Sequence, residues 1–190
     1  HHNAVWLAAD RVTAHLPFAD GTAEPATYNF YVNDTFQGRA PGRIVAAAPP
    51  THQSPTPDRL QLAQELVWRG PAEWGAPEGR VVLTEQRTID IGCDAGLFVI
   101  DIHSRLHATE WDVTIGPTRH AYFGVRVVEA LRQSHGGVIT DSTGARGAAS
   151  ICDTTSDWLD ISGPAGAERT AGVALMPHAD AAGHPWFVTD

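Results

Sequence analysis

A carboxylate in an apolar strand pattern is the first residue of this sequence that could transfer a proton. Glu85 lies within the alternating segment 80–91, in the same register as Val81 and Ile89. Alternate side chains of a strand share a face, so this carboxylate points the way the apolar side chains point. The loss of hydration of a carboxylate among apolar side chains must be offset by hydrogen bonds or by an opposite charge. Two alternatives follow. The group is structural, because the strand twists or bulges there or because Arg87, two residues on, or another arginine neutralises it; or the face borders a polar cavity in which Glu85 acts.

Histidines in the late segment 176–190 are the candidate partners of this carboxylate. His178, His184 and Trp186 surround a short loop there. Several histidines in turn-rich segments with tryptophans nearby favour a ligand site. A carboxylate and a histidine on opposite sides of a sugar can take and give a proton. The pattern therefore predicts a catalytic set of Glu85, His178 and His184.

Further side chains could bind the substrate, and two of them, His2 and His120, could instead be the histidine that exchanges a proton with it. Arg126 would bind hydroxyls or the carboxylate of a uronate, and tryptophans would stack on the face of a sugar. The binding residues predicted on these grounds are His2, Trp6, His120, Arg126 and Trp186.

Histidine spacing argues against a metal centre. His103 and His107 are four residues apart, which on a strand places them about 13 Å apart, too far to share an ion. We expect them, with Asp101 and Arg105, to form a solvated sheet face, although a sugar groove could use it. His1 and His2 are adjacent and would point to opposite faces of a strand. We therefore expect no metal and no cofactor.

Composition restricts the partners. The 190 residues carry a net charge of −9, with 13 arginines that do not cluster along the sequence, so a nucleic acid would be repelled. No apolar run reaches the roughly 20 residues of a membrane helix, so we expect no membrane partner and favour the cytoplasm. The absence of lysine excludes Schiff-base chemistry on a lysine.

Strand periodicity predicts an all-β fold. The alternating segments 80–91 and 97–108 flank the turn sequence "GCDAG" and predict a hairpin. The segment 59–70 fits either a strand or a short helix, and the proline-rich segment 46–58 is expected to be a surface loop. Further short strands are expected at 121–131, which could end in a helical turn, and at 136–144 and 170–178. The 18 glycines and 13 prolines favour turns between short strands, and the pattern as a whole favours an antiparallel β-sandwich.

The start of the chain and its two cysteines allow two more expectations. "HHNAVWLAAD" enters an apolar strand without a lead-in, so we expect an N-terminal part of a single domain, spanning 1–190, to be missing. Cys93 and Cys152 lie in no metal-binding spacing, and we expect two free thiols.

Several segments together resemble a known family. In order, "LTEQRTIDI", "IGPTRHAYFGVRV", "ITDSTGARG", "DWLDISGP" and "AGVALMPHADAAGHPWFV" are similar to the PmoA-like family of domains of unknown function, labelled "methane oxygenase PmoA". The resemblance extends to the opening His-His segment and covers nearly the whole chain. The family continues past "WFVTD", so the resemblance implies that a few C-terminal residues are missing as well. The chain departs from the family pattern at Asn3, at Arg119-His120 and around Pro177-His178-Ala179.

The resemblance implies a galactose-mutarotase-like supersandwich, a fold often found in carbohydrate-active proteins. The leading hypothesis is a sugar isomerase, lyase or hydrolase that acts on a small-molecule carbohydrate by acid/base chemistry. A noncatalytic carbohydrate-binding module is the second. A metal-dependent oxidoreductase using His1, His2 and a late histidine is the third.

Overall fold

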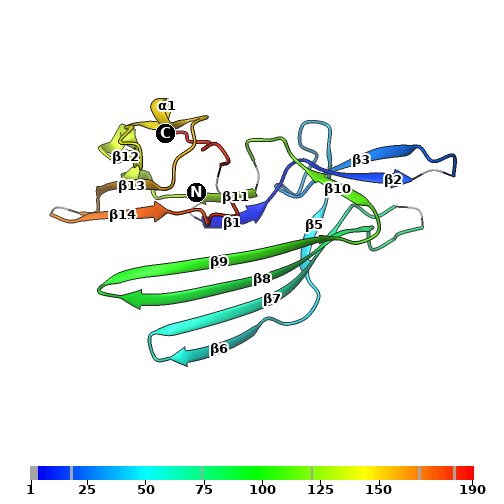
Figure 1. Ribbon diagram of the computed structural model, residues 1–190, viewed down its shortest axis with the longest axis horizontal. Coiled ribbons are helices and arrows are strands. Elements are labelled where there is room, and N and C mark those ends of the chain that lie inside the picture. The colour runs from blue at the N-terminus through cyan, green and yellow to red at the C-terminus, as the bar shows by residue number, and fades with distance from the viewer. Residues whose placement is uncertain (1–3, 18, 74, 121, 167, 182) are drawn as a thin grey trace. The chain divides into compact units, whose positions relative to one another are not determined.

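Strands dominate the computed structural model of the chain (Figure 1). It describes residues 4–17, 19–73, 75–120, 122–166, 168–181 and 183–190. The strands pair almost entirely in antiparallel fashion, which confirms the predicted all-β class. The chain divides into two compact units, with residues 1–6 and 123–190 in unit 1 and residues 7–122 in unit 2.

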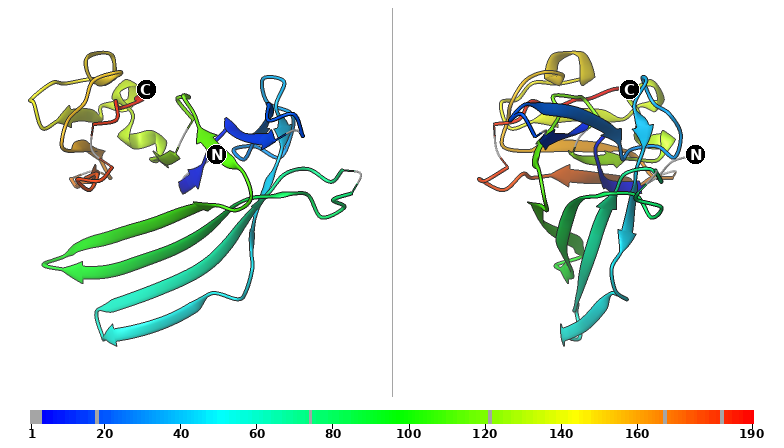
Figure 2. Two further views of the ribbon diagram at one scale, coloured as in Figure 1. Left: turned by 45° about the vertical axis from the view of Figure 1, so that its right-hand side comes forward. Right: turned by 90° about the vertical axis from the view of Figure 1, so that its right-hand side faces the viewer.

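Unit 2 contains two sheets. The first has the order β10-β2-β3-β4, with β10 (Asp112–Ile115), β2 (Val12–Pro17), β3 (Ala23–Asn29) and β4 (Ala40–Pro41). The second has the order β5-β7-β8-β9, with β5 (Arg43–Ala46), β7 (Arg59–Arg69), β8 (Val81–Asp94) and β9 (Leu97–Ala108), and β6 (Thr51–Thr56) also pairs with β7. Figure 2 shows the twist of these long strands from two sides.

The predicted hairpin is the longest feature of unit 2. β8 and β9 pair without interruption from Leu83 opposite Ala108 to Asp94 opposite Leu97. The two residues between them, Ala95 and Gly96, have φ values of 48° and 83°, as a two-residue hairpin turn requires.

The structure decides between the alternatives for one segment and corrects the prediction for its neighbour. The ambiguous segment 59–70 is strand β7, paired along its length with β8. The loop predicted over 46–58 is wrong in part, because β6 forms there and pairs with β7. All six residues of β6 are exposed. Pro55 is tolerated because the register shifts between Gln53 and Thr56, where the ladder needs no amide donor.

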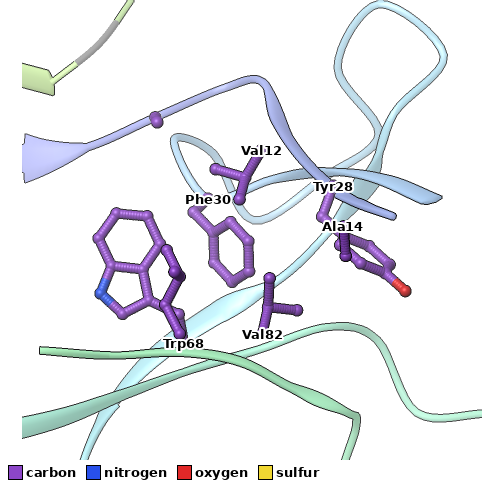
Figure 3. Close-up of a cluster of buried hydrophobic side chains, with 8 residues drawn as sticks. Val12, Ala14, Tyr28, Phe30, Trp68 and Val82 are labelled. Carbon is purple, nitrogen blue, oxygen red and sulfur yellow. The ribbon is translucent and has the colours of Figure 1, made fainter. Parts of the chain in front are cut away.

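The core of unit 2 lies between its two sheets. Trp68 of β7 is fully buried, and its ring centroid lies 4.9 Å from that of Phe30, which follows β3. Figure 3 shows the Phe30 ring among Trp68, Val82 and Val12. Residues from both sheets thus share one apolar layer, as in a β-sandwich. The buried cluster comprises Ala9, Val12, Ala14, Tyr28, Phe30, Trp68, Val82 and Leu83.

Unit 1 has a smaller core on a three-stranded sheet. Its elements are β12 (Val138–Asp141), β13 (Leu159–Pro164), β14 (Thr170–Leu175), the 3₁₀ turns η1 (Glu129–Leu131) and η2 (Gln133–His135), and α1 (Ala148–Ile151). Its buried hydrophobic cluster comprises Leu131, Ile139, Ile151, Leu159, Ile161 and Val188. No helix in the described residues has the length and apolar character needed to cross a membrane.

A further pair of strands, β1 (Ala4–Ala8) and β11 (Tyr122–Arg126), forms a two-stranded sheet. The boundary between the two units falls within both strands. In unit 1, a Cβ atom at Gly124 would lie 2.4 Å from the ring of Trp6. Only glycine therefore lets this indole pack directly on the backbone of β11.

Candidate functional site

The carboxylate of Glu85 is buried within unit 2 and receives five hydrogen bonds. Arg87 donates from Nε to Oε1 at 2.7 Å and from Nη2 to Oε2 at 2.9 Å. Ser104 Oγ donates to Oε1 at 2.7 Å, Trp68 Nε1 to Oε2 at 2.9 Å and the Tyr122 hydroxyl to Oε1 at 3.2 Å. The side chain has no exposed area. Both oxygens of the carboxylate are thus engaged by neighbours in the same unit.

These contacts set the ionisation of the group. Burial raises the pKa of Glu85, but the hydrogen bonds from Arg87, Ser104 and Trp68 and the charge of Arg87 outweigh it, so the pKa is lowered. Burial and the nearby Glu85 charge raise the pKa of Tyr122. Glu85 is therefore an ionised partner of Arg87, as in the structural alternative left open by the sequence. Its catalytic role stays a prediction.

A second buried carboxylate in unit 2 holds one of the predicted binding histidines. Asp10 is 1% exposed. Its Oδ2 accepts a hydrogen bond from Arg39 Nη2 at 2.9 Å and lies 3.1 Å from His120 Nδ1. Its Oδ1 accepts a hydrogen bond from the hydroxyl of Thr118. We call Asp10, Arg39, Thr118 and His120 the Asp10 cluster.

Backbone pairing brings these distant residues together. Asp10 lies in the short connection between β1 and β2, where Phe30 N donates to Ala9 O at 2.7 Å and Gly116 N donates to Arg11 O at 2.8 Å. Thr118 and His120 follow β10, which pairs with β2.

Arg39 reaches the cluster from a tight turn. It pairs with Phe36 through backbone hydrogen bonds of 3.0 and 3.1 Å. Gln37 and Gly38 between them have positive φ values of 50° and 77°. The turn ends directly before β4, and the pairing of β4 with β3 therefore fixes the backbone from which the Arg39 side chain extends.

The ring of His120 is held on its faces as well as at Nδ1. It stacks on Tyr31 with 5.1 Å between ring centroids and an interplanar angle of 20°, and meets Phe36 edge-on at 5.4 Å. A carboxylate beside Nδ1 selects the tautomer with its proton there, so proton exchange with a ligand would use Nε2.

The Asp10 cluster borders a solvent-open pocket of about 250 Å³. Asp10 stays ionised behind it: burial raises its pKa, but hydrogen bonds to Thr118 and His120 and the charges of His120 and Arg39 lower it overall. Such a pocket can bind a small polar ligand beside an oriented imidazole. Its lining residues are Arg11, Gln37, Arg39, Pro117, Thr118, Arg119 and His120.

The other predicted site residues lie elsewhere in the chain. His178, His184 and Arg126 are exposed in unit 1. Trp186, also in unit 1, is half-buried and donates from Nε1 to Ser156 Oγ at 2.8 Å. His2 lies outside the described residues. Convergence of these residues with Glu85 on one pocket stays a prediction.

The strand histidines occupy the solvated face that the sequence predicted. Asp101, His103, Arg105 and His107 of β9 are all exposed. In the described part of the chain, no group of three His, Cys, Asp or Glu side chains is placed to hold a metal ion. His1 of the metal hypothesis lies outside that part, as His2 does. Cys93 and Cys152 are free, as predicted.

Comparison with known proteins gives a family without an activity. A family model described as "Family of unknown function (DUF6807)" matches residues 1–190. No curated protein and no solved structure matches the chain. Membership of a family of unknown function is thus confirmed, whereas the match carries no PmoA-like name, and the function must be argued from the site.

Proposed function

The chain belongs to the DUF6807 family of unknown function, and we propose that it is a carbohydrate-active protein whose ligand binds in the pocket beside His120. One observation carries the proposal: buried Asp10 holds both His120 and Arg39 at the edge of a pocket of about 250 Å³. The sandwich of unit 2 and the resemblance to the PmoA-like family, with its mutarotase-like fold, support a sugar as the ligand by analogy.

His120 is the group that would transfer the proton. Imidazole both takes and gives a proton near neutral pH, and positioned acid/base catalysis contributes about 10²–10⁴-fold to a rate. Asp10 would orient the ring and stabilise its protonated form. This assignment differs from the pairing of Glu85 with a late histidine, because here the orienting carboxylate and the imidazole are in contact.

The proposed chemistry is proton transfer to or from a sugar, as in isomerisation, elimination or glycoside hydrolysis. Arg39 would stabilise negative charge that develops on the ligand, since Asp10 and Gln37 hold its guanidinium at the pocket. A noncatalytic sugar-binding module would use the same pocket without turnover.

The test compares two histidines of unit 2. Neutral and acidic mono- and disaccharides are incubated with wild type, His120→Gln and His107→Gln, and binding and product formation are followed by NMR. His107 is exposed on β9 and serves as the matched control. We expect His120→Gln to lower turnover about a hundredfold or more and His107→Gln to leave it unchanged. Equal turnover in both variants would refute the assignment, and binding without turnover in wild type would show the noncatalytic module.

A further inference from the structure

The pocket beside His120 is lined by an unusual number of arginines. Arg11, Arg39 and Arg119 all border it, and among the described residues no carboxylate appears in its lining. The chain as a whole has a net charge of −9. Three guanidinium groups outnumber the one ionised carboxylate, Asp10, that lies behind them, so the local potential is positive although the protein as a whole is negative.

Arg39 is held in place by several neighbours. Its Nη2 donates to Asp10 Oδ2 at 2.9 Å and to Gln37 Oε1 at 2.6 Å, and its guanidinium carbon lies 5.8 Å from the ring centroid of Phe36. A guanidinium fixed in this way loses little further conformational entropy when it binds an anion.

Part of the Arg39 guanidinium can still meet a ligand. Guanidinium has five N–H donors. Nε is buried, so a ligand in the pocket could not reach it, but the side chain keeps 17% of its area exposed and lines the pocket. An anion there would accept charge-assisted hydrogen bonds from the exposed part of the cation.

We propose that the pocket recognises the anionic group of an acidic sugar, either the carboxylate of a uronate or the phosphate of a sugar phosphate. This inference rests on the proposed function, because it specifies the ligand of the same pocket. Arginine binds both anions through paired, charge-assisted hydrogen bonds. A pocket of about 250 Å³, just below the range of about 300–1,000 Å³ for drug-sized ligands, suits a monosaccharide.

Direct binding tests this inference separately from catalysis. Wild type is titrated by calorimetry with glucuronate, glucose 6-phosphate, glucose and inorganic phosphate at low and high salt. We expect at least one acidic sugar to bind about tenfold or more tightly than glucose, as one charge-assisted hydrogen bond provides, and to weaken with salt. The acidic sugar that binds more tightly identifies the anion.

Variants then locate the binding. The double variant Arg11→Gln/Arg119→Gln removes two of the three arginines. Arg39 is kept, because its loss would leave the buried Asp10 carboxylate without its guanidinium partner. Arg105→Gln, on the exposed face of β9, is the matched control. We expect the double variant to weaken acidic-sugar binding about tenfold or more and the control to leave it unchanged, with melting temperatures showing that both fold.

Three outcomes would overturn the inference: glucose binding as tightly as both acidic sugars, inorganic phosphate binding as tightly as either, or equal affinity in the double variant and the control. The proposed function fails differently. If His120→Gln leaves turnover intact while the double variant loses acidic-sugar binding, the anion site stands and the catalytic role of His120 falls.

Discussion

Arg87 contacts both carboxylate oxygens of Glu85, at 2.7 and 2.9 Å, from a position two residues along the same strand. The spacing places both side chains on one face of β8. Trp68 of β7 and Ser104 of β9 complete the shell from the neighbouring strands. An ion pair whose two carboxylate oxygens are both hydrogen-bonded therefore lies on the face of β8 that also carries apolar core side chains.

Replacing Glu85 by glutamine should destabilise unit 2. The amide leaves the Arg87 cation without its counter-charge, and breaking a buried ion pair costs about 3–5 kcal/mol. Arg87 retains 15% exposure, so we expect a loss near the lower end, about 3 kcal/mol, in urea denaturation. The control is Glu65→Gln, at an exposed position of β7, which should change stability by about 0.5 kcal/mol or less. Equal losses in both variants would contradict the structural role.

Acid should destabilise the wild type through the same groups. The pKa values of Glu85 and Asp10 are both lowered in the folded protein. Their stabilisation is fully present above the unfolded pKa values, about 4.3 and 3.9, and is lost as the pH falls through the lower folded values. Urea midpoints measured from pH 6 down to about pH 3 should fall more steeply for wild type than for Glu85→Gln. Parallel curves would show that the Glu85 pKa is not lowered by folding.

Asp10→Asn should change the tautomer of His120. The Asp10 carboxylate can only accept a hydrogen bond and so favours a proton on Nδ1 in wild type, whereas an asparagine amide can donate to Nδ1 and favour the other tautomer. Nitrogen NMR of the imidazole, which reports which ring nitrogen carries the proton, should show Nδ1–H in wild type and a mixed or Nε2–H form in the variant. His103, exposed on β9, is the internal reference. An unchanged His120 spectrum would mean that Asp10 does not position the ring.

Local patterns predicted the parts of the fold that depend on neighbours in sequence. Alternation in 80–91 and 97–108, with Gly96 between, identified the β8–β9 hairpin because its pairing and its turn are local. The same alternation placed Arg87 beside Glu85 as one of two alternatives. β6 was not predicted because its four neighbouring prolines, Pro49, Pro50, Pro55 and Pro57, are typical of a loop, although its pairing with β7 is local and begins with Thr56 opposite Arg59.

The Asp10 cluster could not be predicted because its members are far apart in the sequence. Asp10 meets Arg39 across 29 residues and His120 across 110. The β10–β2 pairing and the β3–β4 connection create these contacts, and no local spacing encodes them. His120 was predicted as a binding residue because it is a histidine in a turn-rich segment, but no sequence pattern indicated that Asp10 and Arg39 lie beside it.

The most direct test of the His120 pocket as the ligand site is an NMR titration of the whole chain with an acidic monosaccharide, reading the assigned histidine side chains. We predict that the His120 resonances shift in a saturable way while those of His103 and His107 stay constant. Saturable shifts at His178 or His184 with no change at His120 would contradict the account and would indicate that the ligand binds at the late segment 176–190.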